Sequence, residues 1–254
     1  MAGPCSGSLA KCFASLLVIA AVGTSMVACG GGNKHGTTST MPDKGSGVVT
    51  DTKKGATTGA DSSTGCQKVA MPSPEAGRHV PRPAKRLPSG KAYTVRFATN
   101  CGTFDVQLDE KRFPKTTSSV ASLVKAGFYD GLTFHLAIPG GGLGGGDPLG
   151  TGATGKKHLK GGPGYVVVEP PAQSLSYRAG DVVMQRGPGE PRGASGSQFF
   201  VFLAIGQRPE PEFARLGHVV RGLNVVQRLS EQGSTSTVTP SMPLVIRRAT
   251  LTVR

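Results

Sequence analysis

The sequence contains no tryptophan, few acidic residues and few cysteines, and these shortages narrow the possible functions. Its 15 Asp and Glu residues are outnumbered by 29 Lys and Arg, which gives a formal net charge of +14. The basic residues are scattered, and no basic stripe is interleaved with aromatic residues, so a nucleic-acid-binding surface is not expected. The charge predicts a solvated basic surface with a mild attraction for anionic polymers or lipid headgroups.

The usual metal-binding patterns are also missing from the sequence. The chain has five Cys and five His, but it contains no C-x-x-C, no H-E-x-x-H and no cluster of these residue types. Zinc sites depend on such closely spaced ligands. We therefore expect no metal site in this protein.

One apolar run of signal-peptide length, "CFASLLVIAAVGTSMVAC", follows Lys11 and ends at Cys29. It is short for a membrane-spanning helix and polar sequence follows it at once. The end of the run, "SMVAC", resembles a bacterial lipobox, in which the cysteine is lipidated, although Met26 stands where leucine is typical. We expect residues 1–28 to be a signal peptide and the mature protein to be an extracytoplasmic lipoprotein of the cell membrane. The alternative is an ordinary secretory signal with a chance cysteine.

Two segments of low complexity separate this run from the first apolar pattern. Gly, Ser and Thr make up 21 of the 36 residues from 30 to 65, which predicts a flexible tether with a reach of about 30–36 Å. Residues 66–90 contain five prolines, at positions 72, 74, 81, 83 and 88, and form a stiffer, basic linker. Neither segment is assigned secondary structure, and residues 91–254 remain as the folded domain.

Export leaves two of the five cysteines available for a disulfide in the mature protein. Cys5 and Cys12 leave with the signal peptide and Cys29 carries lipid, so Cys66 and Cys101 remain as an even pair outside the cytoplasm. Such a pair is a disulfide candidate in an oxidising compartment. The alternative is two unpaired thiols.

Short strands and two helices are predicted from Lys91 onward. "YTVRF" and "TFDVQL" alternate apolar residues around a "TNCG" turn, which indicates an antiparallel hairpin. Helical spacing of apolar residues occurs in "FPKTTSSVASLVKAGF" and in "GLNVVQRLSEQG". Further strands are predicted at "TFHLAI", "YVVVE", "DVVMQR", "QFFVFLA", "LGHVV" and "LVIRRATLTV". The pattern favours a mainly β, closed antiparallel barrel capped by two helices.

A glycine-rich stretch interrupts this pattern, because six of the seven residues from 140 to 146 are glycine. A phosphate-binding loop is one interpretation. However, "GTGATGKK" (150–157) ends in Lys where a magnesium-ligating Ser or Thr is required, and "HLKGGPG" follows it instead of a helix. Phosphate binding is therefore not expected.

Several motifs occur in the order and at the spacing found in the cyclophilins: "RFPKTTSSVASLVKAG", "GFYDGLTFH", "IPGGGLGGGD" and "GSQFFV". The resemblance covers residues 92–254, and "DPLGTG" and "GPGYVVVEPP" are similar to an exported bacterial subgroup. It implies an eight-stranded barrel with two helices, peptidyl-prolyl cis–trans isomerase activity without a cofactor, and proline-containing or unfolded exported polypeptides as partners. A monomer that does not bind nucleic acid is expected.

The resemblance also identifies four positions at which this chain departs from the family. Leu136 stands where the family has its catalytic arginine, Gly141 replaces the pocket phenylalanine, Gly142 stands at the neighbouring apolar position, and Gly144 replaces a glutamine. The resemblance therefore implies a degenerate active-site loop. The family's tryptophan is absent too, so cyclosporin is expected to bind weakly.

Other family positions are retained. Met184, Gln198 and Phe200 match positions that line the proline pocket and hold the peptide backbone, while His135 matches a position beside the arginine and is expected to play a supporting part. Arg186, two residues beyond Met184, is the one cation considered as a substitute for the missing arginine.

Three functions remain open from the sequence. The first is a peptidyl-prolyl isomerase of reduced activity that acts on exported or envelope polypeptides. The second is an inactive peptide-binding or chaperone module in which the glycine loop has lost rigidity. The third is a scaffold whose basic surface contacts envelope polymers in a salt-sensitive way.

Overall fold

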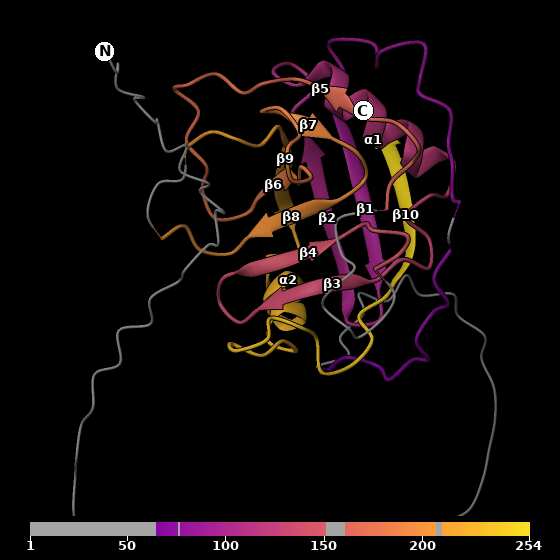
Figure 1. Ribbon diagram of the computed structural model, residues 1–254, viewed down its shortest axis with the longest axis vertical. Coiled ribbons are helices and arrows are strands. Elements are labelled where there is room, and N and C mark those ends of the chain that lie inside the picture. The colour runs from indigo at the N-terminus through magenta and orange to yellow at the C-terminus, as the bar shows by residue number, and fades with distance from the viewer. Residues whose placement is uncertain (1–64, 76, 151–160, 207–209) are drawn as a thin grey trace, which may run out of the picture. The chain divides into compact units, whose positions relative to one another are not determined.

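Figure 1 shows a computed structural model of the protein, in which residues 65–75, 77–150, 161–206 and 210–254 are described. All of them belong to the second of two units, residues 58–254. The predicted signal peptide, Cys29 and the tether lie outside the described residues, as does most of the rejected phosphate-loop pattern.

The fold is built around one antiparallel sheet in the order β10-β1-β2-β9-β6-β8-β4-β3. Two short strands, β5 and β7, pair separately. The bounds of the strands are β1 Tyr93–Thr99, β2 Gly102–Leu108, β3 Phe134–Ile138, β4 Gly142–Gly145, β5 Val167–Val168, β6 Asp181–Met184, β7 Ala194–Ser195, β8 Phe199–Phe202, β9 Arg215–Arg221 and β10 Ile246–Val253.

The sheet curls until its two edge strands, β3 and β10, meet (Figure 1). Thr133 and Val245 form an isolated antiparallel bridge immediately before these strands. The Phe134 N–H donates to the Leu244 carbonyl at 2.9 Å, and the Ile246 N–H donates to the Leu132 carbonyl at 2.8 Å. Edge strands that meet in this way leave few unpaired backbone groups. The predicted eight-stranded barrel with two helices is confirmed, although its closure depends on these few bonds.

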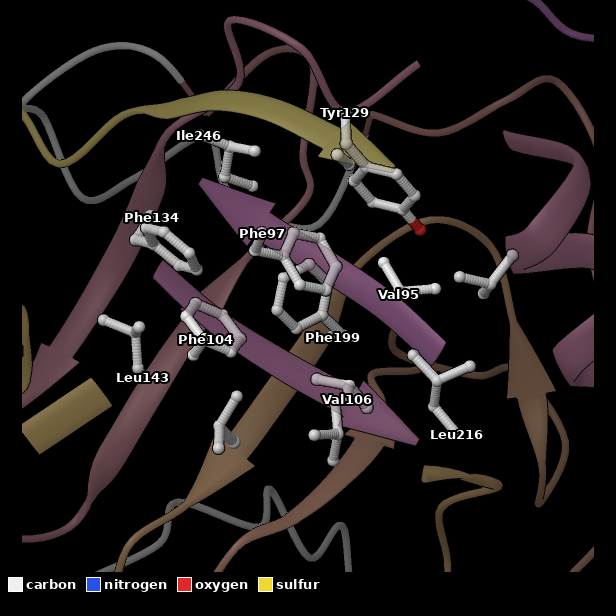
Figure 2. Packing of buried hydrophobic residues seen from close by; sticks show 14 of the residues in the cluster. Val95, Phe97, Phe104, Val106, Tyr129, Phe134, Leu143, Phe199, Leu216 and Ile246 are labelled. Carbon is white, nitrogen blue, oxygen red and sulfur yellow. The ribbon is translucent and has the colours of Figure 1, made fainter. Parts of the chain in front are cut away.

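Aromatic side chains fill the interior of the barrel. Phe97 of β1 stacks on Phe104 of β2 with ring centroids 5.1 Å apart, and it lies 5.3 Å from the ring of Phe199 on β8. Figure 2 shows these rings between Val95, Phe134 and their neighbours. The alternation that predicted the first hairpin therefore reports the inward face of the barrel.

The two helices cover the barrel with apolar faces. In α1 (Pro114–Lys125), Val120, Leu123 and Val124 are buried. The Glu169 carboxylate accepts the backbone N–H groups of Lys115 and Thr116 at 3.1 and 2.8 Å, which satisfies two donors at the helix N-terminus. The shorter α2 (Leu223–Ser230) begins after Gly222, whose φ of 78° suits glycine.

The segment before the barrel, residues 66–90, packs on it without forming a helix or strand in its described part. Val80 and Leu87 pack against the core cluster, and a disulfide joins Cys66 to Cys101 in the β1–β2 turn. The pairing that the cysteine count predicts is thus present. The segment expected to approach the domain as a linker is bound to its surface.

We predict that removing the disulfide lowers stability strongly, because it closes a loop with a sequence separation of 35 residues. The double variant Cys66→Ser, Cys101→Ala should lose about 3 kcal/mol of unfolding free energy in urea titrations. The exposed substitution Lys68→Ala serves as the control. A loss below about 0.5 kcal/mol would contradict a contribution of the disulfide to stability.

Candidate functional site

The glycine-rich stretch forms strand β4, Gly142–Gly145, between β3 and β8. Gly144 pairs with Leu136 on one side and with Phe200 on the other, and all four residues of the strand are buried. The part of the stretch from Gly142 to Gly145 is therefore a paired strand and not a loop. Hydrogen bonding along both edges holds this backbone between β3 and β8.

Glycine is required in β4 because the Phe200 ring lies close to its backbone. A Cβ added at Gly142 would lie 2.3 Å from Phe200 Cζ and 2.4 Å from the Val201 carbonyl oxygen. A Cβ at Gly144 would lie 3.1 Å from Leu136 Cβ and 3.3 Å from Phe200 Cδ2. Leu136, Gly144 and Phe200 therefore form a continuous apolar surface on the outside of the sheet, with Phe200 filling the space beside the glycines.

Leu136 reaches this outer surface because the β3–β4 pairing is irregular between Phe134 and Leu136. Phe134 is buried in the core, Leu136 is partly exposed, and Ala137 is again in the core. An extra residue in one strand shifts the alternation of side chains in this way. That residue, His135, is buried, and its Nδ1 would lie 3.1 Å from a Cβ added at Gly150. It therefore packs toward the chain beyond β4, which fits a supporting part.

Gln198 lies two residues before Phe200 and is 6 % exposed. Its Nε2 donates to Asp147 Oδ2 at 3.2 Å and to the Gly161 carbonyl at 3.0 Å. These two acceptors fix the orientation of the amide, and its oxygen has no hydrogen-bond partner among the described residues. The side chain lines a cavity of about 330 Å³ beside the apolar surface.

Met184 does not line the pocket, which corrects the sequence-based assignment. It is fully buried within the core cluster, and it pairs across the strands with Phe199, which also points inward. Phe200 follows Phe199 and points to the opposite face of the sheet. Met184 therefore stabilises the barrel and does not contact a ligand on the outer surface.

Arg186 is also not placed as a substitute for an arginine at position 136. Strand β6 ends at Met184, so Arg186 lies in the following loop. Its Nη2 pairs with Glu212 Oε2 at 2.8 Å, and its Nη1 donates to the Glu190 carbonyl at 2.7 Å. Its side chain lines the cavity that contains Gln198, whereas Leu136 and Phe200 do not.

Two further aromatic residues extend the apolar surface and were not singled out from the sequence. The Phe202 ring lies 5.2 Å from Phe200 and 5.6 Å from Tyr177. Burial raises the pKa of Tyr177 to about 12, so its hydroxyl stays protonated and donates to the Phe213 carbonyl at 2.6 Å. The alternation in "QFFVF" carried the signal, because every second residue of β8 points outward.

Within the described ranges, no group of three His, Cys, Asp or Glu side chains is placed to hold a metal ion. Neither of the two helices in this part of the chain is long and apolar enough to cross a bilayer.

The sequence model of the family "Cyclophilin type peptidyl-prolyl cis-trans isomerase/CLD" matches residues 94–251. The chain belongs to the cyclophilins. A peptidyl-prolyl cis–trans isomerase of Arabidopsis thaliana is 28 % identical over 161 residues, which cover 63 % of this chain and 94 % of the relative. The isomerase ppi1 of Schizosaccharomyces pombe is 31 % identical over 155 residues, 61 % of this chain and 96 % of the relative.

A crystal structure of a cyclophilin-type isomerase from Cryptosporidium parvum has the same fold. It superposes with a TM-score of 0.54 at 28 % identity, covering 63 % of this chain and 98 % of that one. A second structure of the same protein, determined in the presence of the dipeptide Ala-Pro, gives the same values. The chain is thus a cyclophilin-type peptidyl-prolyl isomerase by family.

We predict that Gly142→Ala destabilises this cyclophilin, because the new methyl group would overlap both the Phe200 ring and the Val201 carbonyl. Overpacking of this kind costs about 1–3 kcal/mol of unfolding free energy, measured by urea unfolding. Gly206→Ala is the matched control, since a Cβ there meets no described atom within 4 Å. Equal stability of the two variants would mean that Phe200 can leave β4 at little cost.

Proposed function

We propose that this cyclophilin isomerises X–Pro bonds in exported or envelope polypeptides at a rate lowered by the side chain at position 136. The observation that carries the proposal is the outer surface of Leu136, Gly144 and Phe200 beside the oriented amide of Gln198. An apolar surface of this kind suits a proline ring, and an oriented amide suits the backbone of an extended peptide. A related structure determined with Ala-Pro supports proline-containing peptides as ligands.

The chemistry explains which part of the site is weakened. Rotation about an X–Pro bond breaks amide resonance, with a barrier of about 18–20 kcal/mol. A donor or cation near the prolyl amide lowers this barrier only if it stabilises the twisted bond more than the planar one. Phe200 and Gln198 bind both forms, so they contribute to affinity more than to rate.

Leu136 offers neither a donor nor a charge at the position where the family resemblance places the catalytic arginine. Removal of one preorganised donor from an active site typically costs about 10²–10³ in rate. Gly141 and Gly144 add no side chain that replaces it. Reduced catalysis with retained binding follows from this arrangement.

Action outside the cytoplasm is supported by the N-terminal apolar run and by the disulfide. The run ends at Cys29 in a lipobox-like sequence, and the Cys66–Cys101 bond is of a kind that persists in oxidising compartments. A lipid on Cys29 would keep the domain near the membrane surface, where newly exported chains emerge.

The second candidate function is a peptide-binding module without catalysis. The same observation, Leu136 in place of a charged side chain, favours it. The two functions differ in one measurable respect: both bind proline-containing peptides, but only the first accelerates the exchange between their cis and trans forms.

We predict that Leu136→Arg raises kcat/KM for an Ala-Pro-Phe peptide by about 10²-fold, measured by NMR exchange or in a protease-coupled assay. The position is partly exposed, so a guanidinium can reach solvent and the bound peptide. Leu136→Met is the control, because it keeps an apolar side chain of similar size without charge.

Three results are informative. Activity in the unmodified protein that Leu136→Arg leaves unchanged would show that another donor acts on the amide. Activity that appears only in Leu136→Arg would establish the peptide-binding module as the natural state. No peptide binding to any variant would contradict both functions.

A further inference from the structure

The segment from Cys66 to Val80, here called the arm, lies outside the part of the chain that matches the family, residues 94–251. It is nevertheless attached to the barrel at several points. The Cys66–Cys101 disulfide fixes one end, and the Gln67 N–H donates to the Asn100 carbonyl at 2.8 Å. In Figure 1 this part of the chain runs along the outside of the barrel.

Two backbone hydrogen bonds join the arm to the segments that orient Gln198. The Glu75 N–H donates to the Pro148 carbonyl at 3.1 Å, and the Val80 N–H donates to the Pro163 carbonyl at 3.1 Å. Pro148 follows Asp147, and Pro163 is two residues beyond Gly161. Asp147 and Gly161 supply the two acceptors of the Gln198 amide, so the arm holds the chain on both sides of that side chain.

Arg78 fastens the arm between these two bonds. Its guanidinium donates to the carbonyls of Phe128 and Asp130 and lies 5.9 Å from the centroid of the Phe128 ring. It also pairs with Glu75, and its side chain is only 18 % exposed. A guanidinium with this many partners fixes the backbone around it, because its fork of donors is rigid.

His79, the next residue, forms part of the cavity that contains Gln198 and Gln185. A Cβ added at Gly164 would lie 2.4 Å from His79 Nδ1, so the imidazole packs directly on the glycine backbone of the cavity wall. The side-chain oxygens of Gln185 and Gln198 are buried there without hydrogen-bond partners among the described residues. Buried acceptors without partners cost free energy, so either oxygen would gain a hydrogen bond if peptide binding turned its amide toward a peptide N–H.

We propose that the arm completes the peptide-binding site of this protein. Through its bonds at Pro148 and Pro163 it positions Gln198, and through His79 it supplies a wall for peptide residues beyond the X–Pro pair. The proposal rests on the proposed function, since it assumes that a peptide binds at Phe200 and Gln198. The competing explanation is that the arm only braces the barrel, in which case its side chains affect stability but not the choice of peptide.

The test compares two peptides on the full-length chain purified in mild detergent. The dipeptide Ala-Pro has one residue before its proline, whereas Ala-Ala-Ala-Ala-Pro-Phe has four that can extend toward the cavity. Dissociation constants are measured by NMR titration for the unmodified protein, for His79→Ala and for Lys85→Ala. Lys85 is exposed just beyond the arm and does not line the cavity, so it controls for loss of a side chain near it.

We expect His79→Ala to raise the dissociation constant of the hexapeptide about three- to tenfold, the effect of one or two lost contacts, and to leave Ala-Pro binding unchanged. Lys85→Ala should change neither. If His79→Ala and Lys85→Ala bind the hexapeptide equally well, the wall formed by His79 is disproved. If neither peptide binds the unmodified protein, the proposed function itself has failed.

A second variant tests positioning independently of the wall. Arg78→Ala should alter the chemical shifts of the Gln198 side-chain amide and weaken hexapeptide binding. Arg78→Lys should partly restore both, since lysine keeps the charge and can still donate to one of the carbonyls, although it lacks the guanidinium fork. If the arm only braces the barrel, Arg78→Ala should lower the unfolding free energy and leave the Gln198 resonances unchanged. That result would overturn the positioning part of the proposal.

Discussion

The contact between the Phe200 ring and the backbone of β4 is the constraint on which the site depends. The ring lies so close to Gly142 that no side chain fits between them. Strand β4 lies between β3 and β8 and bonds to both. The contact therefore also determines how close Leu136 on β3 lies to the Phe200 ring on β8. Glycine here is therefore a condition of close packing, and the strand is paired on both sides although three of its four residues are glycine.

The close contact also explains why the glycines at positions 142 and 144 are compatible with a well-packed strand. Loss of side chains at positions 141, 142 and 144 would leave a hole if the neighbouring strand kept its place, and holes in packed surfaces are costly. The structure has no such hole at Gly142, since the Phe200 ring occupies the space. The result is a flatter apolar surface, bordered by Phe202 and Tyr177, which is the surface that the proposed function assigns to the proline ring.

Much of the fold was readable from the sequence, and the errors have identifiable physical causes. The β1–β2 hairpin and both helices follow from side-chain periodicity. Strand β4 was missed because glycines carry no alternation. Met184 was assigned to the pocket because it matches a pocket position of the family. The face it occupies is set by the register of a four-residue strand with Phe199, which the sequence does not show. The prediction that Arg186 replaces the arginine was wrong for a related reason. Strand β6 ends before Arg186, and Glu212 binds its guanidinium.

The arm shows how a segment with no secondary structure of its own can still determine a site. Its proline-rich sequence predicted only a linker, because the groups it binds are carbonyls at Pro148, Pro163, Phe128 and Asp130, which no sequence pattern reveals.

The disulfide at Cys66 has a separate consequence. It joins the arm covalently to the β1–β2 turn, so a force on the chain before Cys66 acts on the barrel and not on the weaker hydrogen bonds around Gln198. In the proposed lipoprotein, tension on the chain before Cys66 would therefore bypass the arm.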